Sequence, residues 1–165
     1  MYELAIIGGG PAAVAAGIYA GRKQIKTALI TESFGGQSIV SDDIQNWVGE
    51  KNISVTDLAK KMRSHLESQQ GIDITEAELV KSIEKINDGP PSGHFLLTTK
   101  SGKTFEAKTV LMAAGSGRRR LGIPGEDEYD GKGVVFCSTC DAPLFKDKDV
   151  AIIGAGNSAL EAVID

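Results

Sequence analysis

The residues of this sequence that can do chemistry gather in one short segment, FCSTCDAPLF, residues 136–145. It holds the only two cysteines of the chain, Cys137 and Cys140, and Asp141 follows them directly. A pair at this spacing can bind a metal, form a structural bond, or alternate between dithiol and disulfide. In the redox interpretation a thiolate is the nucleophile, and Asp141 stands where it can manage the thiol proton.

The metal and structural interpretations find less support. A structural zinc site needs four ligands, and the only histidines, His65 and His94, lie far upstream without metal-like spacing. We therefore expect no metal site. The polar spacer Ser138-Thr139 and the acid that follows the pair do not resemble a buried core. The sequence thus favours a redox pair.

A glycine turn near the start of the chain predicts a dinucleotide site. In GGGPAA, Gly8, Gly10 and Ala13 fit the G-x-G-x-x-G/A fingerprint between an expected strand, 2–7, and an expected helix, 11–22. The glycines permit a tight turn and close approach of a pyrophosphate, which the helix N-terminus attracts. Glu32 follows the next expected strand, 27–30, where an acid can bind a ribose. The alternative is a plain turn with a surface acid.

A second glycine turn, GAGNSA, repeats this pattern near the end of the chain. Gly154, Gly156 and Ala159 hold the same three positions, and the apolar run DVAII before them predicts a strand. Two such turns imply either two nucleotides or one nucleotide and an unused copy. We expect the strand that would follow this second helix, with its ribose-binding residue, to lie beyond Asp165.

The remaining elements complete an α/β chain. We expect an amphipathic helix over 54–70, capped by Ser54 or Thr56 and ended by Gly71. Strands within 72–86 and 94–100 predict a small antiparallel meander, broken at 87–93, and 109–115 predicts a third buried strand. The Gly- and Pro-rich segment 118–132 predicts a linker, which divides the chain into domains 1–117 and 118–165.

Composition excludes several classes of protein. The chain has 165 residues, 41% of them hydrophobic, and a net charge of -4 with RRR as its longest basic run, so we expect no nucleic-acid partner. No apolar run approaches the roughly 18 residues of a membrane span, and the apolar start enters a glycine turn without a charged leader or cleavage site. We expect a cytoplasmic protein with no membrane partner. In that compartment a cysteine pair is more often catalytic or metal-binding than structural.

Six segments in this order, GGGPAA, ESFGGQ, NWVG, AAGSGRRRLGIPGE, FCSTCDAPLF and GAGNSALEA, resemble the amino-terminal part of low-molecular-weight thioredoxin reductases. They are similar as well to the related flavoprotein subunit of alkyl hydroperoxide reductase. The resemblance covers essentially the whole chain. It implies a Rossmann-like FAD-binding domain with a small antiparallel meander, followed by the start of a Rossmann-like NAD(P)H-binding domain that carries the redox pair.

The resemblance also implies roles for individual residues. Cys140 corresponds to the thiol that faces the flavin, Cys137 to the thiol that attacks a partner disulfide, and Asp141 to the proton donor. Ala114 and Ala142 depart from the threonine and glycine that the family more often has there. The residues implied to bind FAD are Gly8, Gly10, Pro11, Ala12, Glu32, Gly35, Gly36, Gln37, Asn46 and Gly115, and those implied to bind NAD(P)H are Gly154, Gly156, Asn157, Ser158 and Ala159.

The implied function is transfer of electrons from NADPH or NADH through FAD to the Cys137–Cys140 disulfide, and on to a thioredoxin-like or peroxiredoxin-type protein disulfide. The alternatives are a fragment of a hydroperoxide-reductase flavoprotein, a flavin-binding or interaction module without activity, and a nucleotide-binding regulator. From the resemblance we expect this chain to be a fragment, with weak or no flavin binding and no turnover, of a reductase that is a homodimer in its full-length form.

Overall fold

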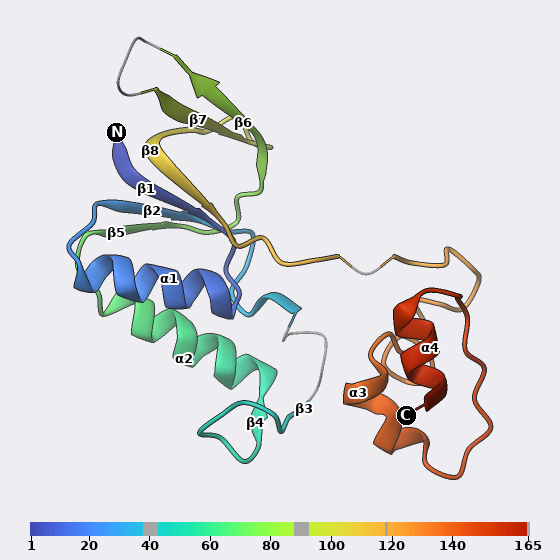
Figure 1. Ribbon diagram of the computed structural model, residues 1–165. Helices are drawn as coiled ribbons and strands as arrows, with labels where there is room; N and C mark the ends of the chain where they lie inside the picture. Colours follow the sequence, from blue (N-terminus) through green and yellow to red (C-terminus); the bar gives the residue numbers. More distant parts are fainter. Residues whose placement is uncertain (38–42, 88–92, 118, 165) are drawn as a thin grey trace. The chain divides into compact units, whose positions relative to one another are not determined.

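The computed structural model describes residues 1–37, 43–87, 93–117 and 119–164 (Figure 1). The chain divides into two compact units, Met1–Ser116 and Gly117–Asp165. The boundary lies one residue before the one expected from the sequence, and the assignment of one cofactor to each unit stays a prediction.

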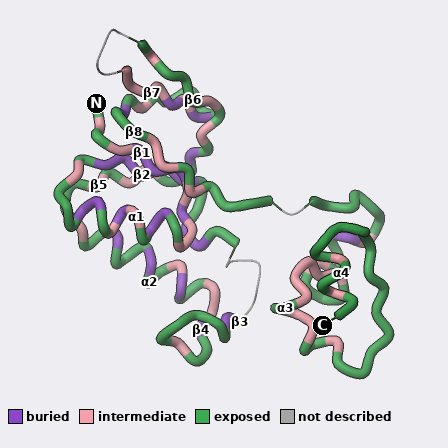
Figure 2. Tube along the Cα trace, in the orientation of Figure 1, coloured by how far each residue is buried: buried purple, intermediate pink, exposed green. Residues whose placement is uncertain are grey.

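A six-stranded sheet with the strand order β5-β2-β1-β8-β7-β6 forms the centre of the first unit. Neighbours among β5, β2, β1 and β8 pair in parallel, whereas β6 and β7 pair antiparallel and β7 joins β8 in the same way. β2 is buried along its whole length and β1 over its second half, as expected of parallel strands in the interior of a sheet (Figure 2). The strands are β1 (Tyr2–Ile7), β2 (Thr27–Ile30), β5 (Ile72–Thr75), β6 (Val80–Ile86), β7 (His94–Thr99) and β8 (Thr104–Met112).

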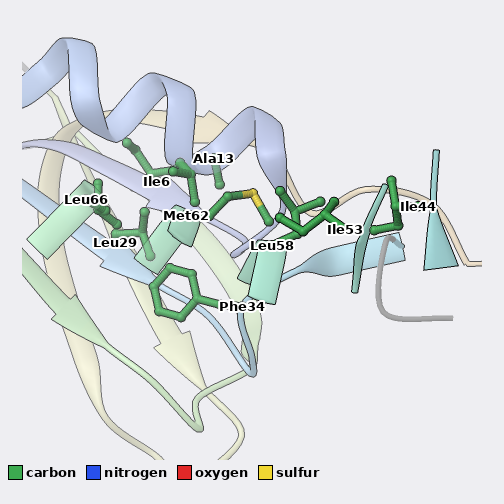
Figure 3. Packing of buried hydrophobic residues seen from close by; sticks show 10 residues of the cluster. Ile6, Ala13, Leu29, Phe34, Ile44, Ile53, Leu58, Met62 and Leu66 are labelled. Carbon is green, nitrogen blue, oxygen red and sulfur yellow. The ribbon is translucent and has the colours of Figure 1, made fainter. Parts of the chain in front are cut away.

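Two helices pack on one face of this sheet, α1 (Pro11–Arg22) against the strands and α2 (Val55–Glu67) against α1 (Figure 1). The small residues of α1 let the helices approach: a Cβ built on Gly17 would lie 2.5 Å from a methyl carbon of Leu66. Figure 3 shows the core between these layers, where Ile6 and Leu29 of the sheet and Leu66 of α2 are fully buried. A two-stranded antiparallel ribbon, β3 (Asp43–Ile44) and β4 (Ile53–Ser54), precedes α2.

Several predicted elements are confirmed. The expected strands 2–7 and 27–30 and the expected helix 11–22 are β1, β2 and α1 with the same ends. The helix predicted over 54–70 is the shorter α2, and Ser54 caps it, because its hydroxyl oxygen accepts the N–H of Asp57 at 3.1 Å. The α/β class is therefore correct.

The predicted meander differs in two respects. β5 pairs in parallel with β2, so it belongs to the nucleotide-type sheet, and the antiparallel part consists of β6, β7 and β8. The strand expected at 109–115 is the second half of β8, which runs unbroken from Thr104, ends at Met112 and is only partly buried. One strand thus serves both parts of the sheet. Most of the predicted break at 87–93 lies outside the described residues.

The second unit contains two short helices, α3 (Ser138–Asp141) and the 3-10 helix η2 (Ala142–Phe145), and then α4 (Asn157–Ile164). The prediction of a strand before the second glycine turn is wrong: residues 149–153 have no regular structure, and the side chain of Ile153 is 67% exposed. A parallel strand needs neighbours to pair with its backbone groups. In the part of this unit that the structure describes, the one ladder contact is an isolated bridge between Asp130 and Val134.

Candidate functional site

The first glycine turn joins β1 to α1 and is shaped by close backbone contacts. Gly8 has a φ of +124° and donates its N–H to the carbonyl oxygen of Ile30 at 2.9 Å. A Cβ at this position would collide with the carbonyl group of Ala113. Gly10 is the N-cap of α1, and Pro11 occupies its first turn. Because Gly10 has no side chain to cap the helix, the N–H groups of the first turn remain available to a ligand.

A second glycine loop, Gly35 to Gln37, packs against the first turn. The N–H of Gly35 donates to the carbonyl oxygen of Gly9 at 3.0 Å. Gly36 has a φ of +57°, and a Cβ built on it would lie 2.9 Å from the Cα of Gly10. The two loops therefore meet backbone to backbone, with no room for a side chain on Gly36.

The segment after β8 also packs near these two glycine loops. The N–H of Ala113 donates to the carbonyl oxygen of Ile7 at 2.9 Å, which continues the pairing of β8 with β1. The side-chain amide of Gln37 donates to the carbonyl oxygen of Ser116, the residue after Gly115. Three segments far apart in sequence thus meet where β1, β2 and β8 end, and the carboxyl ends of parallel strands are where ligands bind in open α/β sheets.

Glu32 and Asn46, the other two residues predicted to bind FAD, lie in different surroundings. Glu32 is exposed two residues after β2, the position expected for an acid that binds a ribose. Asn46 is exposed in the segment between β3 and β4. The next residue, Trp47, lines a hollow of about 240 Å³ together with Pro11, so this segment approaches the start of α1.

The structure adds Gly9, Thr31 and Ser33 to the residues that the sequence indicated. A Cβ on Gly9 would collide with the hydroxyl oxygen of Thr31 and the carbonyl oxygen of Ser33. Thr31 donates its hydroxyl to that same carbonyl at 2.7 Å, so the end of β2 and the glycine turn form one packed unit. The available sequence signal is Gly9, the middle glycine of the GGG run, but the fingerprint leaves that position unspecified.

The cysteine segment lies in the second unit. Cys137 is the N-cap of α3, its carbonyl oxygen accepts the N–H of Asp141 at 3.0 Å, and it is disulfide-bonded. Cys140 is the one other cysteine of the sequence, but its side chain is outside the described part of the structure. The redox use of the pair therefore stays a prediction. Phe136, directly before Cys137, has the Arg120 guanidinium 5.4 Å from its ring centre.

The segment predicted as a linker is a hydrogen-bonded loop. The carboxylate of Glu126, 4% exposed, accepts the N–H groups of Leu121 and Gly122 at 2.9 and 2.6 Å. These backbone hydrogen bonds, that of Leu121 first, lower the pKa of Glu126. Arg120 holds Asp130 at 2.5 Å across the same loop. The loop before the cysteines is thus fixed by its own polar contacts.

The second glycine turn is only partly built. Gly154 has a φ of +137°, and the carbonyl oxygen of Gly156 accepts the N–H groups of Ala159 and Leu160 at 3.0 and 3.1 Å as α4 begins. Asn157 and Ser158 are exposed at the start of this helix. The turn and the helix are present, but the supporting strand is not.

Comparison with known proteins decides the family. A model of the pyridine nucleotide-disulphide oxidoreductase family matches residues 2–164. The chain belongs to this family. Membership implies a flavin and a nicotinamide cofactor for the oxidoreductase. Among the described residues, no helix is long and apolar enough to cross a membrane, and no three His, Cys, Asp or Glu residues are grouped to hold a metal.

Relatives of this chain include thioredoxin reductases. A thioredoxin reductase structure from Streptococcus pyogenes is 38% identical with a TM-score of 0.84, over 99% of this chain and 51% of that one. An alkyl hydroperoxide reductase subunit of Staphylococcus aureus is 39% identical and an NADH dehydrogenase of Bacillus subtilis 38%, each over 99% of this chain and 31% of the relative. The resemblance seen in the sequence is confirmed, and the chain spans about a third to a half of the length of these relatives.

Proposed function

We propose that this chain carries the FAD-binding part and the redox cysteine segment of a reductase that passes electrons from NADPH or NADH to a protein disulfide. The observation that supports this most is the meeting of three glycine segments at the ends of β1, β2 and β8, in a chain that also contains a Cys-x-x-Cys pair. Because the chain spans a third to a half of its relatives, turnover is proposed for a protein that contains it.

The residues of the first unit fit a dinucleotide. Gly8, Gly10, Pro11 and Ala12 would hold the pyrophosphate at the start of α1, and Glu32 the ribose. The loop Gly35 to Gln37, with Asn46 and Gly115, would line the flavin. Bound FAD would accept a hydride equivalent from the nicotinamide and make two electrons available to a disulfide.

The second unit would supply the thiols and their surroundings. Cys140 would receive the electrons and Cys137 would exchange with the partner disulfide, while Asp141 would move the thiol proton. In such a two-electron couple about 30 mV corresponds to about 1.4 kcal/mol, so a single hydrogen bond beside the pair can change the direction of electron flow. Gly154, Gly156, Asn157, Ser158 and Ala159 would bind NAD(P)H.

Two candidate functions, reduction of a thioredoxin-like protein and reduction of a peroxiredoxin-type protein, differ only in the protein partner. The likeness to thioredoxin reductases favours a thioredoxin-like partner, and the likeness to the subunit of alkyl hydroperoxide reductase favours a peroxiredoxin-type partner. Turnover of each partner by a reductase that contains this chain would distinguish them. A flavin-binding module would reduce neither. The homodimer of the full-length form and the cytoplasmic location stay predictions.

FAD binding by a reductase that contains this chain tests the proposal, because the chain alone is expected to bind flavin weakly or not at all. The variant Gly10→Ala is suited to it, because Gly10 has a φ of −80° and the Cβ would lie 3.6 Å from Gly36, an ordinary contact. We expect G10A to keep the melting temperature of wild type but to lose at least about tenfold in FAD affinity, because the methyl group occupies the place of the pyrophosphate. Gly117→Ala, in open space, is the matched control. Equal FAD affinity of G10A and wild type, or no binding by wild type, would count against the proposal.

A further inference from the structure

Glu78 is a buried carboxylate between two parts of the sheet. It lies between β5 and β6 and is 6% exposed. Its two carboxylate oxygens accept hydrogen bonds from the Ser101 hydroxyl at 2.7 and 2.9 Å. One of them also lies 2.9 Å from the ammonium nitrogen of Lys103. The hydroxyl oxygen of Thr99 lies 3.1 Å from the hydroxyl oxygen of Ser101, so these two groups also share a hydrogen bond. A buried charge with this set of donors is well satisfied.

The backbone around Glu78 joins the turn between β7 and β8 to the end of β2. The N–H of Glu78 donates to the carbonyl oxygen of Thr31 at 3.0 Å. One residue later, the carbonyl oxygen of Leu79 accepts the N–H of Lys100 at 2.8 Å. The preceding residue, Ala77, has a φ of +60°, which is costly for a residue with a side chain. Such a backbone persists only where its surroundings hold it in place.

Thr31, which accepts the N–H of Glu78, also contacts the glycine turn. It is 4% exposed, and its N–H donates to Thr75 at 3.0 Å while its hydroxyl donates to Ser33 at 2.7 Å. The Thr31 hydroxyl lies directly against Gly9, whose carbonyl oxygen accepts the N–H of Gly35. Glu32 is the next residue along the chain. Hydrogen bonds and packing contacts therefore lead from the backbone N–H of Glu78, whose carboxylate binds Ser101 and Lys103, to both glycine loops and to the residue before the acid proposed to bind the ribose.

We propose that Glu78 is a positioning residue of the dinucleotide site, and that its carboxylate fixes Thr31 and thereby the two glycine loops. The inference rests on the proposed function only for the identity of the ligand. Hydrogen bonds from Lys103, Ser101 and Thr99 lower the pKa of Glu78 to about 2, so the carboxylate is charged at neutral pH. A purely local role, in which Glu78 stabilises the β7–β8 turn alone, is the alternative.

Amide hydrogen exchange in the isotope-labelled 165-residue chain separates the two roles. In Glu78→Gln we expect two backbone amides, that of residue 78 and that of Gly35, to exchange at least about tenfold faster than in wild type, after correction for global unfolding. The Gly35 amide is the decisive probe, because a local role at the β7–β8 turn does not reach it. Glu84→Gln, an exposed acid on β6, is the matched control and should change neither amide. FAD titration of a reductase that contains this chain, as wild type and with each substitution, should show about a tenfold loss of affinity in E78Q alone.

A milder variant covers the case in which E78Q fails to fold. Ser101→Ala removes one donor to the carboxylate and should speed exchange at Gly35 in the same direction but less. Unchanged exchange at Gly35 in both E78Q and S101A would overturn the inference, as would unchanged FAD affinity in E78Q where wild type binds FAD. If the wild-type reductase does not bind FAD, the proposed function fails, and the exchange at Gly35 still decides the role of Glu78.

Discussion

The N–H of Gly35 donates a hydrogen bond to the carbonyl oxygen of Gly9 at 3.0 Å, which joins two loops 26 positions apart in sequence. Beside it, a Cβ on Gly36 would lie 2.9 Å from the Cα of Gly10. The proposed pyrophosphate site is therefore shaped by backbone atoms, and a single added methyl group should disturb it.

Gly36→Ala should destabilise the first unit by more than the usual cost of replacing a glycine that has a positive φ. Gly71 also has a positive φ, +77°, but its Cβ would meet open space, so Gly71→Ala should cost only about 1 kcal/mol. We expect G36A to cost at least about 1 kcal/mol more, because its Cβ also collides with Gly10. Urea unfolding followed by the fluorescence of Trp47, the only tryptophan, measures both. Equal costs would show that the two loops do not pack as closely as described.

The contact of Gly17 with Leu66 predicts that one substitution changes sign with its background. Leu66 is fully buried, so Leu66→Ala should cost about 3 kcal/mol. Gly17→Ala in wild type gains helix propensity but crowds the Leu66 methyl group, which makes it neutral or destabilising. In the L66A background the crowding is gone, and G17A should stabilise by about 1 kcal/mol. The same effect of G17A in both backgrounds would contradict the packing of α1 on α2.

Glu78 predicts a dependence of stability on acid pH. Its pKa falls from an ordinary value of 4.5 to about 2 through hydrogen bonds from Lys103, Ser101 and Thr99. A lowered carboxyl pKa stabilises the folded state fully above the ordinary value, and this stabilisation is lost as the pH falls from about 4.5 to about 2. The difference in unfolding free energy between wild type and E78Q should therefore be constant from pH 8 to 6 and shrink below about pH 5.

Urea unfolding at a series of pH values checks this expectation. Lys103→Met removes the charge next to the Glu78 carboxylate and should flatten the acid-dependent difference from E78Q. A difference between wild type and E78Q that grows as the pH falls would have the wrong sign for a lowered pKa.

Local patterns were enough to predict the elements that open the chain. The apolar run before Gly8, Pro11 at the start of α1 and the small residues after it determine β1 and α1 from neighbouring residues alone. Which strands pair is a long-range property. The sequence pattern therefore places β5 in the meander and divides β8, whereas β5 pairs in parallel with β2 and β8 is one strand. Residues 149–153 show the same limit: their apolar pattern is typical of a strand, but a strand also needs a neighbour to pair with.

Only those residues of the candidate site that belong to a known motif could be predicted from the sequence. The fingerprint indicated Gly8 and Gly10, but the packing of Gly9 on Thr31 depends on the fold. Glu78 gave no signal at all, because a single acid in a polar segment resembles a surface residue until its burial and its contacts with Ser101 and Lys103 are known. Residues that act by positioning others are recognised by such contacts.

The central claim, that a bound flavin exchanges electrons with the Cys137–Cys140 pair, is tested most directly by anaerobic reductive titration. A reductase that contains this chain is loaded with FAD and titrated with dithionite, and the electrons taken up per flavin are counted from the absorbance. Cys137→Ser should take up about two electrons per flavin, and wild type about four, because its disulfide stores two more. Equal uptake by wild type and C137S would contradict the account.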